Sequence, residues 1–198
     1  MLIYRAYKTE IEPNNKQKTL LAKSAGTARF AYNWALGIKK EAFDKKAKIP
    51  TAIDLHKKLN KLKQTEFAWM YEVSKCSPQT ALFDCDDAFK NFFRKCKQKI
   101  KGKKGFPKFK YKKTGAGKFN INGIIKINET HIQLPRLGKL KLKEQNYMPI
   151  NCHIINTTVS QHADKWFVSV LVKEEIAQKT KQEKIVGVDL GIKTLAVV

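Results

Sequence analysis

The sequence predicts an α+β protein in which strands from both ends of the chain flank a helical middle. Between about residues 14 and 100, apolar residues recur at three- and four-residue steps, as on the buried face of a helix. After Lys118 the apolar period changes to two, which is typical of half-buried strands. Five or six short strands at this spacing favour a small barrel or sandwich, and the first strand of the chain is expected to join it. The helices would then form an insertion.

The chain begins with a predicted strand over residues 2–11, which Pro13 ends. Asn14 can cap the helix that follows, because its side chain can accept a hydrogen bond from a free backbone N–H of the first turn. The helical period continues to about residue 46. Gly26 weakens the middle of this helix and leaves open a break into two helices.

Two further helices have recognisable starts. Thr51 with Asp54 resembles a capping box and opens a basic helix that runs to about residue 64. Ser77-Pro78 predicts a helix with Ser77 as the N-cap and Pro78 as the first helical residue. One apolar face of this last helix is expected to lie in the core; it carries Leu82, Cys85, Phe89, Phe92, Cys96 and Ile100.

The second half of the chain is predicted to be a series of short strands. They cover residues 119–122, 124–128, 131–134, 139–143, 152–162 and 166–173. Residues 176–184 are polar and are expected to form a linker. Residues 185–198 begin a new apolar pattern of a strand, a tight turn at Gly191 and a second strand.

The formal net charge of +23 on 198 residues calls for a polyanionic partner, and nucleic acid is the leading candidate. Residues 88–128 contain 14 Lys or Arg and no Asp or Glu. Within them, residues 101–113 interleave lysines, which neutralise phosphates, with aromatic rings, on which bases stack. Gly and Pro favour a loop here, and a solubilising basic linker remains the alternative. The candidate nucleic-acid contacts of this loop are Lys101, Lys103, Lys104, Lys108, Lys110, Tyr111, Lys112 and Lys113.

Composition and cysteine spacing restrict the class of protein. A hydrophobic fraction of 42% is enough for a core. The sequence contains no run of about 18 apolar residues, so it predicts no membrane span. The four cysteines form no C-x-x-C pair, which is typical of reduced thiols in a cytosolic protein. We therefore expect a cytoplasmic, nucleoid-associated protein with no membrane partner.

Asp189 is expected to follow a buried apolar strand and to precede a glycine turn at Gly191. A carboxylate in such a place needs a cation or a hydrogen-bond donor. It could bind divalent metal as in RNase H-like nucleases, face a nucleotide phosphate as in actin-type ATPases, or cap the turn.

Five motifs in order resemble the N-terminal half of the TnpB (OrfB) family of insertion-sequence-encoded, RNA-guided DNA endonucleases, which are related to type V CRISPR effectors. The motifs are Arg5-Ala6-Tyr7-Lys8 with Pro13 and Gln17, Arg29-Phe30-Ala31-Tyr32-Asn33, residues 81–93, Gly105-Phe106-Pro107-Lys108-Phe109-Lys110, and Gly187-Val188-Asp189-Leu190-Gly191 with Leu195-Ala196. Each motif is modest, but their order along the whole chain makes the resemblance specific.

The resemblance implies an architecture of four segments. A wedge-like β-barrel would comprise residues 1–12 and 118–175, and a helical recognition domain with the basic loop would comprise residues 13–117. After the linker, residues 185–198 would be the first strands of a RuvC-like nuclease domain of RNase H fold.

The resemblance also implies guide RNA and double-stranded target DNA as partners, and a role in transposition and DNA recombination. By position, five further residues match regions where relatives contact DNA: Tyr32, Asn33, Ser77, Gln79 and Thr80. Asp189 matches the first catalytic carboxylate, which would bind Mg²⁺ in a complete nuclease.

The sequence departs from the family pattern at its C-terminal end. Family nucleases need a Glu and a second Asp from later RuvC segments and a zinc ribbon, and these are not in the sequence. We therefore expect a truncated RuvC-like domain, no cleavage by this chain alone, and a missing C-terminal half as a candidate partner. Two alternatives stay open: a nuclease-dead RNA- or DNA-binding repressor of the same descent, and an unrelated basic RNA-binding protein.

Overall fold

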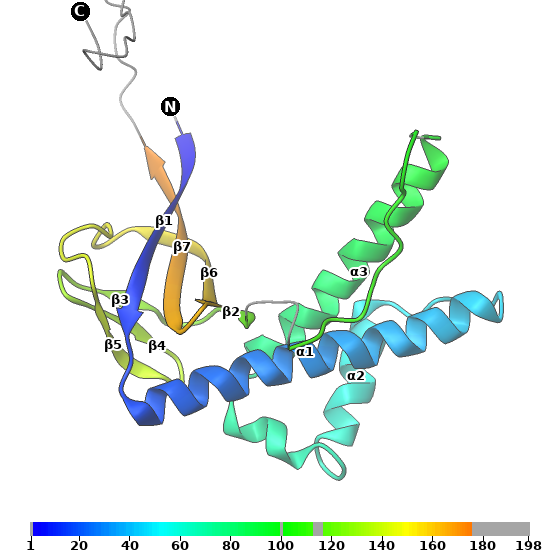
Figure 1. The fold of residues 1–198 in the computed structure, drawn as a ribbon, viewed down its shortest axis with the longest axis horizontal. Coiled ribbons are helices and arrows are strands. Elements are labelled where there is room, and N and C mark those ends of the chain that lie inside the picture. The colour runs from blue at the N-terminus through cyan, green and yellow to red at the C-terminus, as the bar shows by residue number, and fades with distance from the viewer. Residues whose placement is uncertain (1, 100, 113–116, 176–198) are drawn as a thin grey trace, which may run out of the picture.

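The computed structural model describes residues 2–99, 101–112 and 117–175, with a β-sheet at one end of the molecule and helices at the other (Figure 1). Asp189, Lys113, the predicted linker and the predicted RuvC-like strands of residues 185–198 lie outside the described residues. No helix in the described ranges is long and apolar enough to cross a membrane.

The seven described strands form one antiparallel sheet with the order β2-β6-β7-β1-β5-β4-β3. Their bounds are β1 Leu2–Glu12, β2 Lys118–Ile121, β3 Lys126–Ile127, β4 His131–Leu134, β5 Gly138–Leu142, β6 His153–His162 and β7 Lys165–Glu175. The first strand of the chain therefore lies at the centre of the sheet, between strands that come more than a hundred residues later. This confirms the α+β class.

The prediction of a barrel is wrong for the described strands, because the sheet is open. β1 pairs with β7 from Leu2 to Ile11 and with β5 only at Ile11 and Glu12. The two outermost strands, β2 and β3, have four and two residues, and no pairing between them closes the described sheet. β2 contacts helices α1 and α3 instead. The alternating pattern predicts strands but does not say whether the two ends of the sheet meet.

The helical part comprises α1 Asn15–Asp44, α2 Ala52–Leu62, the short 3₁₀ helix η1 Ala68–Glu72 and α3 Cys76–Lys97. The helix α1 runs unbroken through Gly26, so the break that the glycine left open does not occur. Small residues on one face of α1 let α3 pack closely against it. These buried residues are Ser24, Ala25, Thr27, Ala28, Ala31 and Ala35.

A two-residue connection joins the central strand β1 to α1, and Gln17 fixes the joint. Asn14 and Gln17 form a reciprocal capping box. The Gln17 Nε2 also donates to the carbonyl oxygens of Leu137 and Lys139, at 3.2 and 2.7 Å. Those carbonyls belong to the turn before β5 and to β5 itself, so a single glutamine joins the start of α1 to the sheet.

The predicted capping box of α2 is confirmed, whereas the predicted start of α3 is wrong. The Thr51 hydroxyl accepts from the backbone N–H of Asp54, whose carboxylate accepts from the N–H of Thr51. The helix α3 begins one residue before Ser77, so Ser77 lies inside its first turn and is fully buried. The Ser-Pro pair is a local signal for the start of a helix. It cannot show that packing extends the helix to the residue before the serine.

An ion pair is buried between α1 and α3. The ammonium of Lys39 bonds the carboxylate of Asp86 and the carbonyl oxygen of Pro50. The side chains of Lys39 and Asp86 are 2% and 16% exposed, so water barely reaches the pair. The lysine ammonium also lies over the ring of Phe89, 5.6 Å from its centroid.

Replacement of Gly117 by Ala is expected to destabilise the junction of sheet and helices. A Cβ at Gly117 would lie 3.0 Å from the Cβ of Ala25 on α1, and the Gly117 carbonyl is held by a hydrogen bond of 2.7 Å from the Gln161 N–H. Overpacking of this kind costs roughly 1–3 kcal/mol. Gly26→Ala is the matched control, because a Cβ there meets nothing within 4 Å and should stabilise α1 by about 1 kcal/mol. Urea unfolding of both variants measures the difference; equal stability of the two would contradict the close approach.

Candidate nucleic-acid interface

The basic loop of residues 101–112 contains no helix or strand and runs back along α3 towards α1 (Figure 1). Phe106 packs against the rings of Phe43, Phe89 and Phe92, with centroid distances of 5.5, 5.6 and 5.0 Å. Five lysines of the loop face solvent, Lys101, Lys103, Lys104, Lys108 and Lys112, and Tyr111 is 63% exposed. The phenylalanine thus attaches the loop to the core while its charges stay accessible.

Asn33 and Tyr32 attach the far end of the loop to α1. The backbone N–H of Lys110 donates to Asn33 Oδ1 at 2.8 Å, and Asn33 Nδ2 donates to the Lys110 carbonyl at 2.9 Å. The Lys110 ammonium lies 3.7 Å from the centroid of the Tyr32 ring. Burial is the main cause that raises the pKa of Tyr32 to about 12, with smaller contributions from Cys85 and Asp84. The tyrosine is therefore neutral at physiological pH and serves as a face for the lysine.

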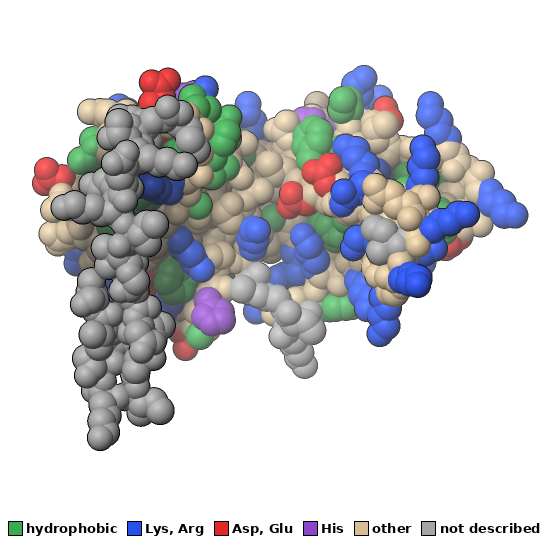
Figure 2. Space-filling model, turned by 90° about the horizontal axis from the view of Figure 1, so that it is seen from above, with side chains coloured by type: hydrophobic (Ala, Val, Ile, Leu, Met, Phe, Trp, Pro, Cys, Tyr) green, Lys and Arg blue, Asp and Glu red, His purple; other side chains and the backbone are tan. Residues whose placement is uncertain are grey.

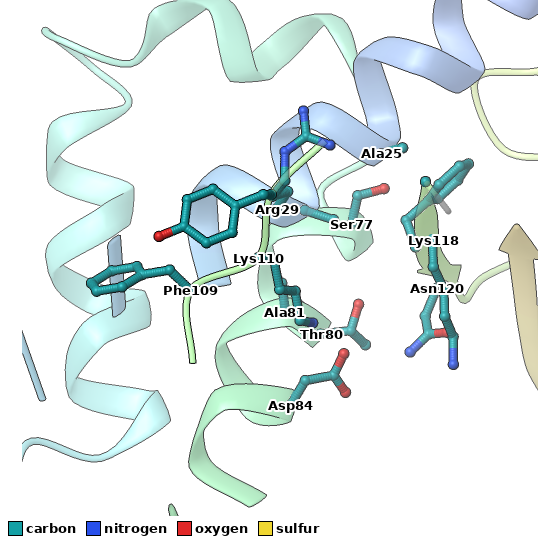
Figure 3. Close-up of a pocket in the computed structure, with 14 residues that line it drawn as sticks. Ala25, Arg29, Ser77, Thr80, Ala81, Asp84, Phe109, Lys110, Lys118 and Asn120 are labelled. Atoms are coloured by element: carbon teal, nitrogen blue, oxygen red, sulfur yellow. The ribbon is translucent and has the colours of Figure 1, made fainter. Parts of the chain in front are cut away.

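A cavity of about 390 Å³ lies where α1, α3, β2 and the end of the loop meet (Figure 3). Ser77, Thr80 and Asp84 follow one another along α3 and line one side of it. The other lining residues are Ala25, Ala28 and Arg29 from α1, Ala81 from α3, Phe109, Lys110 and Tyr111 from the loop, and Gly117, Lys118, Phe119 and Asn120 from β2 and the residue before it.

The polar groups of this cavity are partly unsatisfied. The Ser77 hydroxyl is completely buried and has no hydrogen-bond partner among the described residues. Arg29 forms no ion pair with any residue that the structure describes. Burial raises the pKa of Asp84, and the charges of Lys110 and Lys118 oppose that shift. A buried hydroxyl without a partner is costly, and a ligand in the cavity would offset this cost.

The structure brings four of the predicted site residues to this cavity: Ser77, Thr80, Lys110 and Tyr111. Gln79 is half-buried on α3 but does not line it. Five predicted lysines are exposed along the loop; they are Lys101, Lys103, Lys104, Lys108 and Lys112.

Sequence reasoning missed Arg29, Asp84, Lys118 and Asn120. Two spacings in the sequence could have indicated that some of these residues share a face. Lys118 and Asn120 are two residues apart on a strand and therefore share a face, and Ser77 and Asp84 are seven apart, about two helical turns. Nothing local says that these two faces meet, because β2 and α3 are brought together only by the fold.

The positive charge of the surface is concentrated on the helical part of the molecule. Figure 2 shows Lys and Arg side chains gathered over the end of the molecule that the helices form. No group of three or more His, Cys, Asp or Glu side chains that could hold a metal ion occurs among the described residues. The four cysteines are free, and burial is the main cause that raises the pKa of the Cys85 thiol to about 11, so this thiol is protonated at neutral pH.

Comparison with known proteins identifies similar sequences. Residues 1–48 match the family model HTH_OrfB_IS605, described as a helix-turn-helix domain. The chain is 29% identical over 196 residues to "Putative RNA-guided DNA endonuclease InsQ" of Escherichia coli (strain K12), covering 97% of this chain and 46% of that protein. It is 27% identical over 197 residues to "Putative RNA-guided DNA endonuclease" of Streptomyces pristinaespiralis, covering 98% of this chain and 47% of that protein.

The chain thus spans about half the length of the curated relatives it matches. The predicted resemblance to the N-terminal half of TnpB/OrfB-family proteins is confirmed. The matched residues 1–48 contain β1 and the single helix α1, so within the described part of that range no turn divides two helices.

Proposed function

We propose that this chain is the nucleic-acid-binding part of a transposon-encoded, RNA-guided DNA endonuclease, acting in transposition and DNA recombination. In this proposal it binds a guide RNA and double-stranded target DNA. The observation that carries the proposal is the cavity between α3 and β2, which combines an unsatisfied buried hydroxyl with cations and aromatic rings beside an exposed lysine loop. The alignment with the two relatives over almost the whole chain supports it.

The cavity and the loop suit different parts of a nucleic acid. Base edges present donors and acceptors together, and the cavity offers both kinds through Ser77, Asp84 and Asn120. A carboxylate such as Asp84 would repel a phosphate, so the cavity fits a base better than a backbone. The exposed lysines of the loop, which has no acidic residue, fit phosphates. Bases would therefore enter the cavity while the loop follows the backbone.

The proposal also assigns a role to each segment of the chain and to Asp189. Residues 1–12 and 118–175 would act as the wedge-like domain, residues 13–117 as the recognition domain, and residues 185–198 as the start of a RuvC-like domain. Asp189 would contribute to Mg²⁺ binding together with a C-terminal half on the same or another chain.

Ser77→Ala is expected to weaken nucleic-acid binding without loss of stability. Removal of a buried hydroxyl that lacks a partner spares its desolvation cost, so the free energy of unfolding should stay equal or rise by about 1–3 kcal/mol. Ser24→Ala is the control, because that buried hydroxyl donates to the carbonyl of Leu20. Urea unfolding and filter binding of both variants measure the two effects. Unchanged affinity of the Ser77→Ala variant would contradict a ligand in the cavity.

The experiment that tests the function is sequencing of the RNA that co-purifies with the protein. A single discrete RNA is the expected result for a guide-binding protein. Bulk ribosomal RNA would mean binding by charge alone and would refute guide binding, leaving a basic RNA-binding protein of the same descent.

A further inference from the structure

A second cavity of about 990 Å³ lies on the other side of the start of α3, towards β3 and β4. We call it the Lys63 groove, after the lysine at the end of α2 that lines it. Its other cations are Lys75 from the start of α3, Lys126 from β3 and Arg136 from the turn after β4. None of its lining residues is Asp or Glu. The first cavity contains Asp84, whereas the Lys63 groove has no carboxylate in its lining. The groove is therefore better suited to bind an anion.

Lys63 is the unusual member of this groove. Only 6% of the residue is exposed, although lysines are rarely buried without a partner. Its ammonium makes one long hydrogen bond of 3.4 Å to Asn60 Oδ1, and no carboxylate pairs with it among the described residues. An ammonium has three N–H donors, so two of them have no partner in the part of the chain that the structure describes. Burial lowers the pKa of Lys63, which means that the charged form is disfavoured until an anion joins it.

We propose that the Lys63 groove binds a backbone phosphate of a nucleic-acid strand. A phosphate oxygen would supply both the missing acceptor and the missing negative charge. Arg136, on the opposite side of the groove and exposed, would bind the same or the next phosphate.

The position of the groove favours a strand over a free phosphate ion. The Cys76 thiol bonds the Asn122 carbonyl at 3.3 Å, and these two residues line the Lys63 groove, whereas Ser77 and Asn120 line the first cavity. Neighbouring residues of the same two segments therefore line both cavities. A strand with a base in the first cavity would place its backbone across this contact. The inference rests on the proposed function in that it takes the same nucleic acid as ligand.

The test compares the binding of a single-stranded RNA oligonucleotide and of a DNA duplex over a range of salt concentrations. Lys63→Met keeps the apolar stem and removes the charge, and Arg136→Gln is a second variant on the other side of the groove. Lys57→Met is the matched control, because Lys57 is exposed on the same helix and does not line the groove. Thermal melts check the fold, and Lys63→Met is expected to melt at the same or a higher temperature.

We expect Lys63→Met to weaken binding of at least one of the two nucleic acids roughly tenfold or more, as for loss of a hydrogen bond to a charged group. The slope of log affinity against log salt should fall by about 0.7–0.9, and Lys57→Met should change the affinity much less. Affinities of Lys63→Met and Arg136→Gln equal to the wild type would overturn the inference and leave the proposed function standing.

Titration with inorganic phosphate separates the two sources of the anion. Stabilisation by inorganic phosphate that depends on Lys63, combined with unchanged affinity for RNA and DNA, would identify a free-phosphate site and overturn the inference. A wild-type protein that binds neither RNA nor DNA would overturn the proposed function, and the nucleic-acid phosphate with it.

Discussion

Replacement of five lysines of the basic loop by Ala is expected to lower the salt dependence of RNA binding by several units of log–log slope. The replaced residues are Lys101, Lys103, Lys104, Lys108 and Lys110, all exposed in the structure. Each neutralised phosphate adds roughly 0.7–0.9 to the slope, so five contacts account for about 3.5–4.5. Filter binding between low and physiological salt measures the slope. The effect should be large because Phe106 and Asn33 hold the loop in place, which spares the bound state much of the cost of ordering it.

The control is a variant with the same change of charge elsewhere on the surface. Five exposed lysines from the start of α1 and from α2 suit this purpose; they are Lys16, Lys18, Lys57, Lys58 and Lys61. An equal loss of slope in both variants would mean that the protein binds by overall charge. An unchanged slope in the loop variant would mean that the loop is a solvated linker, as the sequence alone left open.

Asp86→Ala is expected to destabilise the fold by about 3–5 kcal/mol, because it leaves the buried ammonium of Lys39 without its counter-ion. The exposed Lys90–Asp87 pair on the same helix provides the control, since Asp87→Ala removes a carboxylate that water already screens. Urea unfolding of the two variants should show a large loss only for Asp86→Ala. Similar losses would contradict a structural role for the buried pair.

The double variant Lys39→Met/Asp86→Leu separates the cost of an unpaired charge from the worth of the pair. Replacing both members of a buried pair with apolar side chains of similar volume is often neutral or stabilising. We expect the double variant to be far closer to the wild type than Asp86→Ala. Stability as low as that of the single variant would mean that packing at Asp86, rather than charge, dominates its contribution.

The features that sequence predicted well depend on neighbours along the chain. The N-cap at Asn14 and the capping box at Thr51 join residues three apart, and both occur as predicted. The strand β4 has the predicted bounds, because its alternation and the turn before it are local signals.

The features that sequence could not predict depend on contacts between distant segments. Asn33 bonds Lys110, 77 positions away, and nothing in either neighbourhood marks that partner. Closure of a barrel would require β2 to meet β3, and β2 packs on helices instead. Ser77 looked like a cap because its own neighbours suit one, yet packing buries it within the helix. The candidate cavity is such a meeting of distant segments, so only some of its residues were predicted.

The joint between β1 and α1 gives the molecule a lever. The 30 residues of α1 extend about 45 Å at 1.5 Å per residue, and the capping glutamine ties the near end of this helix to β5 and to the turn before it. A tilt of about 10° at the joint would move the far end of the helix by roughly 8 Å, on the same 1.5 Å rise per residue. A small rearrangement of the sheet would therefore become a large displacement at the tip of α1. The sheet would hold the near end of α1 in place, and the far end of the helix would move the most.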